Sequence, residues 1–236
     1  QFGFKCTRRA RKNVSVMYRV AAPQRYTASY FAVEGDYSQA AFLAVLGCVI
    51  GGITVTGLNP DSQQGDKVIL DILKRCGGKF KPVEGGLHFD RSLLKATEID
   101  LADCPDLGPI LFTLGCFCSG ETVIRNAGRL RLKESRRIEA MQTELRKMGA
   151  RIEVDGDTVH IQGVALHAPN APLSGHNDHR IVMALAVAAI ASGLPALLCG
   201  AEAVDKSWPA FWSVLRGLGA KVELNTDKQE EFDIKA

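Results

Sequence analysis

The chain has 236 residues, of which 46% are hydrophobic and 23% are charged, a composition typical of ordinary soluble proteins. Its apolar runs are much shorter than the roughly 20 residues that cross a membrane, so we expect no membrane partner. The net charge of +3 is too small to indicate a nucleic-acid-binding protein.

Residues 1–35 have the pattern of strand fragments followed by a hinge. Residues 15–20 (SVMYRV) and 27–33 (TASYFAV) are rich in β-branched and aromatic side chains, which favour strands. The basic run at 5–12 (KCTRRARK) has no interleaved aromatic residues, so we interpret it as a solvated strand edge or hinge. These residues fit none of the repeats that follow, and we expect them to be the tail of a preceding domain.

The rest of the chain repeats one pattern three times. LKRCGGKF (73–80), LRKMGARI (145–152) and LRGLGAKV (215–222) each combine the end of an amphipathic helix, a glycine and the start of a strand. They are spaced by 72 and 70 residues. Their glycines fit the left-handed position that ends a helix: Gly77, Gly149 and Gly219.

An earlier helix in each repeat is apolar nearly all round, so we expect it to be buried. Each of these helices is preceded by an aspartate and followed by a glycine: Asp36 and Gly51, Asp106 and Gly120, Asp178 and Gly193. The later helix is amphipathic, and in the second repeat its apolar stripe contains Ile138, Met141, Leu145 and Met148.

We therefore predict an α/β fold in which three layers surround a central set of apolar helices, with the sheets outside. Three repeats of about 70 residues cannot each close a core alone, so they should form one domain. The predicted boundaries are 1–35 for the tail and hinge, and about 36–97, 98–163 and 164–236 for the repeats.

Cations occur where several helices should begin, although the N-terminal end of a helix disfavours positive charge. They belong to the second and third repeats: Lys133, Arg136, Arg137, His179, Arg180 and Lys206. In the first repeat Asp61 aligns with Lys133. If equivalent helix ends share one face, these cations should gather around a small anion with several negative charges. Asp106 and Glu134 cannot bind that anion and would be acid/base groups or caps.

Each of these residues also has a simpler interpretation. Asp36, Asp106 and Asp178 could be helix caps, and Lys133 and Lys206 could be surface charges. Ser135 could be a cap, and His179 could be a structural hydrogen-bonding histidine.

The seven cysteines contain no CxxC pair and no zinc-type cluster, so we expect buried thiols in the cytoplasm and no bound metal. Cys116 and Cys118 are two residues apart on a predicted helix, so their sulfurs should point apart.

Four segments together resemble one known family. LKESRRI resembles the motif K-E-[ST]-D-R, NDHRIVMA resembles N-D-H-R-x-x-M, DKSWPAFW resembles K-[ST]-F-P-x-F/Y, and VEGDYSQAAFLA resembles V-E-G-D-x-S-x-A. They occur in the family's order over residues 33–236. The family is 5-enolpyruvylshikimate-3-phosphate synthase, also called 3-phosphoshikimate 1-carboxyvinyltransferase.

This resemblance implies two domains, each a pseudo-threefold repeat of βαβαββ units with buried helices and outer four-stranded sheets. Residues 1–35 would be the tail of the N-terminal domain and the hinge, and 36–236 the C-terminal domain. The implied reaction transfers the enolpyruvyl group of phosphoenolpyruvate to the 5-hydroxyl of shikimate 3-phosphate and releases phosphate. It needs no metal or organic cofactor.

The matching motifs also imply residue roles. Asp106 resembles the carboxylate beside the shikimate hydroxyls, Glu134 a second acid/base carboxylate, and Lys133 a lysine at the phosphorylated sugar-like substrate. The phosphoenolpyruvate clamp would comprise Arg137, Arg180 and Lys206, with His179 beside it. Arg136 departs from the family, which usually has aspartate at this position.

The family runs to nearly twice this length, and its serine-rich loop for the shikimate phosphate belongs to the other half. We expect half a site and an unpaired sheet edge, so turnover would need a complementing N-terminal half or a dimer, or would not occur. Two alternatives stay open: the related transferase acting on UDP-N-acetylglucosamine, and a non-catalytic anion-binding domain.

Overall fold

The computed structural model describes residues 3–11, 15–25, 27, 30, 32–225 and 231–235. The chain divides into two compact units, unit 1 (Gln1–Glu34) and unit 2 (Gly35–Ala236).

Unit 1 contains an antiparallel hairpin of β1 (Cys6–Arg11) and β2 (Ser15–Val20), in which Cys6 lies opposite Val20. The described side chains of both strands are exposed, so the basic run lies largely on a solvated strand, as expected. The second predicted strand fragment, at 27–33, is not a strand in its described residues. Residues 28, 29 and 31 of that fragment lie outside the described residues.

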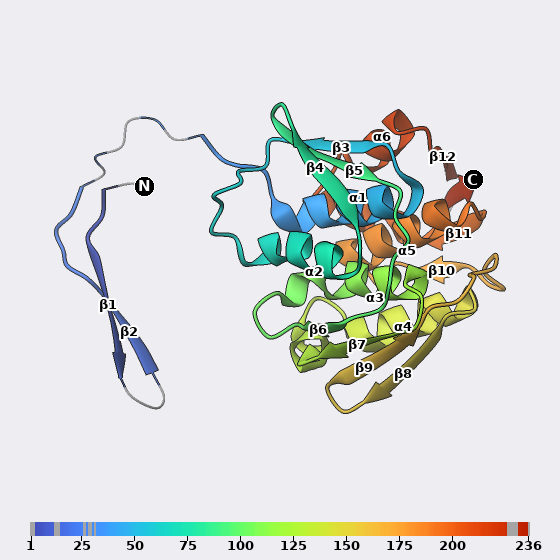
Figure 1. Ribbon diagram of the computed structural model, residues 1–236, viewed down its shortest axis with the longest axis horizontal. Helices are drawn as coiled ribbons and strands as arrows, with labels where there is room; N and C mark the ends of the chain where they lie inside the picture. The colour runs from blue at the N-terminus through green and yellow to red at the C-terminus, as the bar shows by residue number, and fades with distance from the viewer. Residues whose placement is uncertain are drawn as a thin grey trace. The chain divides into compact units, whose positions relative to one another are not determined.

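Unit 2 contains the three repeats, each built from a buried helix, strands and a second helix (Figure 1). The first comprises α1 (Tyr37–Ile50), β3 (Ile53–Thr56), η1 (Gly65–Val68), α2 (Ile69–Arg75), β4 (Lys79–Val83) and β5 (Gly86–Asp90). The second comprises β6 (Glu98–Asp100), η2 (Pro105–Leu107), α3 (Gly108–Phe117), β7 (Glu121–Arg125), η3 (Ala127–Leu132), α4 (Arg137–Lys147), β8 (Arg151–Asp155) and β9 (Thr158–Gln162). The third comprises β10 (Leu173–Ser174), α5 (His179–Ser192), β11 (Ala196–Cys199), η4 (Ala201–Lys206), α6 (Phe211–Gly217), β12 (Lys221–Asn225) and β13 (Glu231–Lys235).

Each repeat forms its own sheet. The second and third sheets have four strands, in the orders β6-β7-β9-β8 and β10-β11-β13-β12. The first sheet, β3-β5-β4, has three strands among the described residues, so the expectation of four-stranded sheets is wrong there. In the other two sheets a segment before the buried helix supplies the parallel fourth strand, β6 or β10. Before α1, Gly35 donates its backbone N–H to the carbonyl of Gly57, just after β3, at 2.8 Å.

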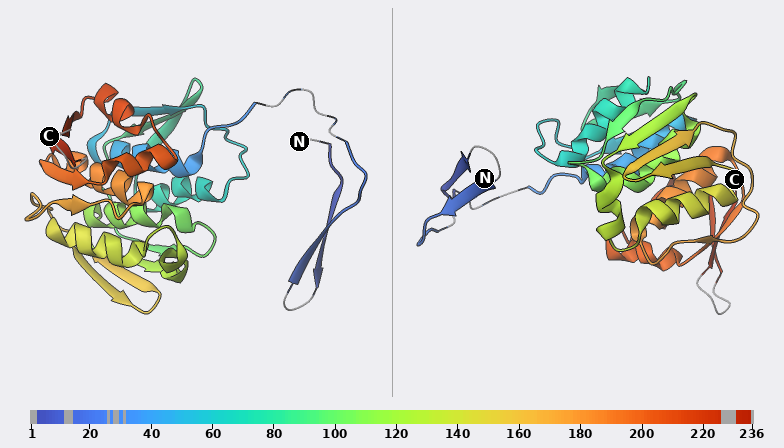
Figure 2. Two further views of the ribbon diagram at one scale, coloured as in Figure 1. Left: turned by 180° about the vertical axis from the view of Figure 1, so that it is seen from behind. Right: turned by 90° about the horizontal axis from the view of Figure 1, so that it is seen from below.

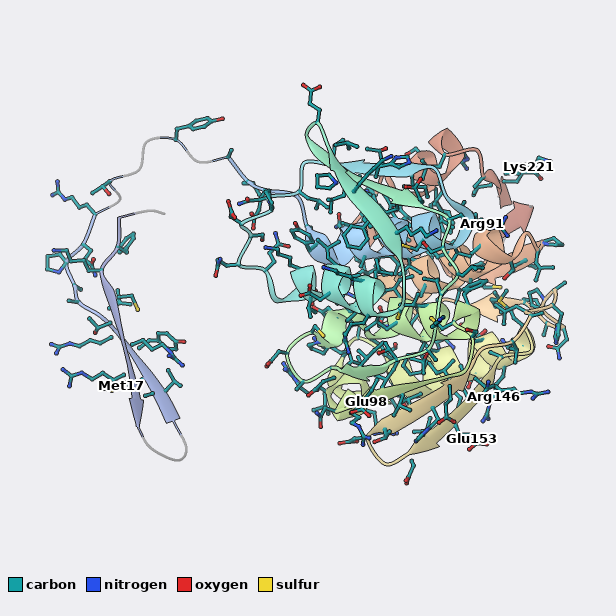
Figure 3. All side chains as sticks on the ribbon, in the orientation of Figure 1. Met17, Arg91, Glu98, Arg146, Glu153 and Lys221 are labelled. Carbon is teal, nitrogen blue, oxygen red and sulfur yellow. The ribbon has the colours of Figure 1, made fainter. Side chains whose placement is uncertain are left out.

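The core lies around α1, α3 and α5, which pack against one another in the centre of unit 2 (Figures 1 and 2). These helices are apolar on every side, so their residues are buried almost throughout, as predicted. Thr113 on α3 satisfies its buried hydroxyl by donating to the Ala184 carbonyl on α5, at 3.0 Å. The sheets lie outside, and Glu153 on β8 and Lys221 on β12 point away from the core (Figure 3).

Glycines in the buried helices let the sheets approach closely. A Cβ at Gly47 of α1 would lie 2.6 Å from Phe89 on β5, and one at Gly115 of α3 would lie 3.0 Å from Ile161 on β9. The same small residue therefore recurs where helix and sheet meet in two repeats.

The predicted ends and faces of the second helices are confirmed. Gly77, Gly149 and Gly219 are left-handed, with φ of 81°, 87° and 94°. The apolar stripe of α4 and its C-cap residue is fully buried: Ile138, Met141, Leu145 and Met148.

The seven cysteines, all within the described residues, are free. Cys116 lies in α3, whereas Cys118 lies just beyond the end of that helix.

Candidate anion-binding site

Of the three aspartates that precede the buried helices, two cap a helix and one does not. Asp36 and Asp178 cap α1 and α5, accepting hydrogen bonds from the backbone N–H groups of Ser38 and Arg180 at 2.8 and 2.9 Å. Asp106 lies inside η2, before α3, and caps no helix. The cap interpretation therefore holds for two aspartates, and the third carboxylate is left to other partners.

Cations from two repeats converge on Asp106. Its Oδ1 lies 2.9 Å from Lys133 Nζ and 3.1 Å from Arg137 Nη1, and its Oδ2 lies 3.8 Å from Arg180 Nη2. Burial by itself raises the pKa of Asp106, but the hydrogen bond from Lys133 and the charge of Arg180 hold that pKa below its ordinary value. Asp106 is therefore an ionised carboxylate within a cationic cluster.

Arg137 is the most buried of these cations, with 2% of its side chain exposed. Its Nε and Nη2 donate to the two carboxylate oxygens of Asp178, at 2.8 and 3.2 Å. Burial alone raises the pKa of Asp178, but Arg137 reverses this and lowers it. This ion pair fixes the orientation of Arg137 and leaves Nη1 directed at Asp106. Arg136, which departs from the family pattern, pairs instead with Glu139 at 2.9 Å.

Glu134 and His179 form a second pair beside this cluster. Glu134 Oε2 lies 2.9 Å from His179 Nδ1, although the geometry is not that of a hydrogen bond. Burial lowers the pKa of His179, Glu134 opposes that shift, and Arg180 reinforces it. The Glu134 side chain is 45% exposed, so its carboxylate is open to solvent or a ligand.

The ligand atoms of Glu134, Asp178 and His179 lie close enough together to hold a metal ion. Asp178, however, already accepts hydrogen bonds from Arg137, from Ser135 and from the Arg180 backbone. These residues fit an ion-pair network better than a metal centre.

Arg180 connects all three repeats. It lies in the first turn of α5, and its Nη1 donates to the Asp106 carbonyl at 3.2 Å. Its Nη2 donates to Ser38 Oγ on α1 at 3.0 Å. Ser38 belongs to the VEGDYSQAAFLA motif but was not among the predicted site residues. The feature of the sequence that could have identified Ser38 is its position two residues after Asp36, at the start of a predicted helix.

Lys133 and Lys206 occupy equivalent positions in their repeats, but these positions are not the helix starts that were predicted. Lys133 follows η3 and Lys206 ends η4, so neither lies in the first turn of a following helix. The carbonyl end of a helical turn favours cations, which accounts for both lysines. Lys206 Nζ contacts the backbone and side-chain oxygens of Asn177, each at 2.6 Å. Among the ion pairs of the described residues, none joins Lys206 to Asp106.

The first repeat contributes a residue that the sequence analysis missed. Burial raises the pKa of Asp66 on η1 to about 6, with Arg180 opposing the shift and the charges of Asp106 and Asp36 adding to it. Asp61, which the repeat alignment placed opposite Lys133, lies on an exposed loop. The available signal for Asp66 was its position just before the second helix, where the other repeats carry cations.

The cluster can therefore bind a small polyanion beside two carboxylates. Lys133, Arg137 and Arg180 supply donors, while Asp106 and Glu134 can accept or give protons. Across the residues that the structure describes, no helix has both the length and the apolar character to span a membrane.

Comparison with known proteins gives a consistent result. The family model for EPSP synthase (3-phosphoshikimate 1-carboxyvinyltransferase) matches residues 1–215. A 3-phosphoshikimate 1-carboxyvinyltransferase of Clostridium acetobutylicum is 40% identical over 222 residues, covering 94% of this chain and 50% of the relative. One from Methanocaldococcus jannaschii is 39% identical over 209 residues, covering 88% and 48%. The chain thus spans about half the length of the curated relatives it matches.

Solved structures agree in fold. EPSP synthase from Acinetobacter baumannii superposes with a TM-score of 0.75 and 25% identity, covering 92% of this chain and 52% of that one. The enolpyruvyl transferase NikO from Streptomyces tendae has a TM-score of 0.62 at 18% identity, covering 86% of this chain and 45% of its own, a likeness of fold alone.

Proposed function

Because the chain belongs to the EPSP synthase family, we propose that it forms one wall of an active site that transfers the enolpyruvyl group of phosphoenolpyruvate to shikimate 3-phosphate. The acceptor is the 5-hydroxyl group, and phosphate is released. The observation that carries the proposal is the convergence of Lys133, Arg137 and Arg180 on Asp106.

Phosphoenolpyruvate is the proposed anion of this cluster. Arg180 and Lys206 supply charge from the third repeat, and Arg137 supplies it from the second. The Arg137 side chain is 2% exposed, and its Nη1 is directed at Asp106. Lys133 lies next to Asp106 and is assigned to the phosphorylated acceptor. His179 flanks the clamp through its contact with Glu134.

The two carboxylates divide the proton transfers. As the acceptor oxygen bonds to the enol carbon, Asp106 takes the hydroxyl proton and Glu134 gives a proton to the methylene carbon. The resulting tetrahedral intermediate then loses a methyl proton to Glu134 as its bond to the phosphate oxygen breaks. Fixed cations stabilise the charge on the leaving phosphate, which requires no metal or organic cofactor.

The groups that bind the shikimate phosphate are proposed to come from a complementing N-terminal half, or from a second copy in a dimer. The half-length coverage of the relatives supports this division. The free thiols suit the reducing cytoplasm, which is the proposed location. Residues 1–35 and 36–236 are accordingly proposed as the tail of the N-terminal domain with the hinge and as the C-terminal domain.

One competing function is a non-catalytic anion-binding domain, for which the cationic cluster around Asp106 would by itself suffice. The relatives' shared name favours the shikimate reaction over transfer to a UDP-sugar.

The test combines the full chain with the N-terminal half of a relative and measures phosphate release from both substrates. We expect release in the mixture and none from the chain alone. Arg180→Ala should reduce release at least about tenfold, since it removes charge-assisted hydrogen bonds of about 1.5–3 kcal/mol. The exposed Arg136→Ala is the matched control. Absence of release from every mixture, together with normal phosphoenolpyruvate binding, would favour the non-catalytic domain.

A further inference from the structure

The loop between β10 and α5 is held in an uncommon conformation. His176 and Asn177 are consecutive left-handed residues, with φ of 49° and 53°, and neither is glycine. This region of backbone space is unfavourable for residues with a side chain, although asparagine tolerates it better than most. Such a conformation persists only where neighbouring groups determine it, and it points to a role in a site.

The first of these neighbouring groups is Glu144 on α4, which is 1% exposed. Its Oε1 lies 2.9 Å from His176 Nε2. Its Oε2 accepts hydrogen bonds from the Ser174 backbone N–H at 2.8 Å and from Lys147 Nζ at 2.7 Å. Burial by itself raises the pKa of Glu144, but His176 and Lys147 bring it below its ordinary value. A buried, ionised carboxylate therefore anchors both ends of the Ser174–His176 turn.

The second neighbouring group is Lys206. Its ammonium contacts two oxygens of Asn177, the backbone carbonyl and the side-chain amide oxygen. Both acceptors are neutral, so the lysine is oriented while its positive charge stays available to an anion. The left-handed conformation of Asn177 directs both oxygens to the same ammonium group.

Backbone hydrogen bonds and close packing connect this turn to the start of α5. The Gly175 N–H donates to the Cys199 carbonyl at 2.8 Å, and the Asp178 N–H donates to the Gly175 carbonyl at 2.9 Å. A Cβ at Gly175 would lie 2.4 Å from Val182, so the turn is tightly packed. Asp178, the next residue after Asn177, caps α5 and binds Arg137.

We propose that Glu144 is a positioning residue that acts through His176 and Asn177 to orient Lys206 at the start of α5. This inference rests on the proposed binding of phosphoenolpyruvate at that place. Glu144 touches no substrate, and its contribution depends on Lys206.

The test measures phosphoenolpyruvate binding to the full chain by calorimetry in a double-mutant cycle. We expect Glu144→Gln and Lys206→Ala each to weaken binding about tenfold or more. The double variant should bind no more weakly than Lys206→Ala alone. Independent, multiplying effects of the two changes would overturn the proposal. Glu139→Gln is the matched control, because it is a carboxylate on the same helix that contacts Arg131 and Arg136 rather than the turn.

If Glu144→Gln fails to fold, a second variant still tests the proposal. Asn177→Gly keeps the left-handed backbone and removes the side-chain acceptor, so it should weaken binding several-fold without lowering the free energy of unfolding. Unchanged affinity in Asn177→Gly would contradict the proposal.

Amide hydrogen exchange tests the anchor without ligand. Ser174 and Asp178 should exchange faster in Glu144→Gln than in the wild type, and equal rates would also contradict the proposal. Failure of the wild type to bind phosphoenolpyruvate would overturn the proposed function and the positioning role with it. Normal wild-type binding that Glu144→Gln leaves unchanged would overturn the positioning role alone.

Discussion

At the scale of single residues, Asp106 shows how one repeated position acquired a new role. The carboxylates of its counterparts Asp36 and Asp178 each cap a helix N-terminus, and Asp178 also pairs with Arg137. Asp106 lies within a short helical turn that begins at Pro105, and its side chain instead meets Lys133 and Arg137. A small shift in where the helix begins thus converts a cap into a candidate base.

Asp66 should make anion binding depend on pH. Its pKa of about 6 means that it is protonated below pH 6 and negatively charged above, where it weakens the attraction of Arg180 for anions. We expect sulfate, whose charge is constant in this range, to bind more weakly as the pH rises from 5 to 8. Asp66→Asn should abolish that step, as measured by calorimetry. The exposed Asp61→Asn should retain it, and a step that survives in Asp66→Asn would assign it to another group.

Arg137 should be essential for stability as well as for binding. Arg137→Met leaves Asp178 buried without its charged partner, which typically costs about 3–5 kcal/mol. Urea unfolding measures this loss. Adding Asp178→Asn should recover part of it, because the amide no longer carries an unpaired charge and asparagine can still cap α5. A loss as small as that of Arg136→Ala would show that the ion pair is not stabilising.

At the scale of elements, the close approach between helix and sheet determines where a glycine of a buried helix can be replaced without loss of stability. Gly47→Ala adds a methyl group 2.6 Å from Phe89 Cβ, so we expect a loss of about 1–3 kcal/mol despite the better helix propensity of alanine.

The matched control is Gly217→Ala, at the end of α6, where a Cβ meets open space. It should stabilise the chain by about 0.5–1 kcal/mol. Thermal and urea unfolding of the two variants give the comparison, and an equal effect would contradict the packing argument.

At the scale of the whole molecule, stability should fall in acid. The pKa values of Asp106, Asp178 and Glu144 are all below their ordinary values of 3.8 and 4.5. Their stabilisation is therefore complete above about pH 4.5 and is lost as the pH falls through their lowered pKa values. The free energy of unfolding should drop by about 1.4 kcal/mol per pH unit for each group protonated only in the unfolded chain. Urea unfolding between pH 7 and pH 3 measures this, and a constant midpoint down to pH 3 would contradict it.

Much of the architecture was predictable because its signals are local. Apolar residues on every side identified the buried helices, and glycines at fixed offsets identified the left-handed ends of the second helices. The first sheet was the exception. Whether residues before α1 pair with β3 depends on contacts between segments, which no local pattern encodes.

By itself, the sequence determined the repeats, the buried helices and the identity of the cations, because periodicity and charge are properties of neighbouring residues. Only the tertiary structure decided which groups meet. It paired Arg137 with Asp178 and placed the Lys206 ammonium against Asn177. It also brought Ser38 and Asp66 close to Arg180, whereas Asp61 lies on an exposed loop. These contacts join residues far apart in the chain, and their geometry follows from how the three repeats pack around one core.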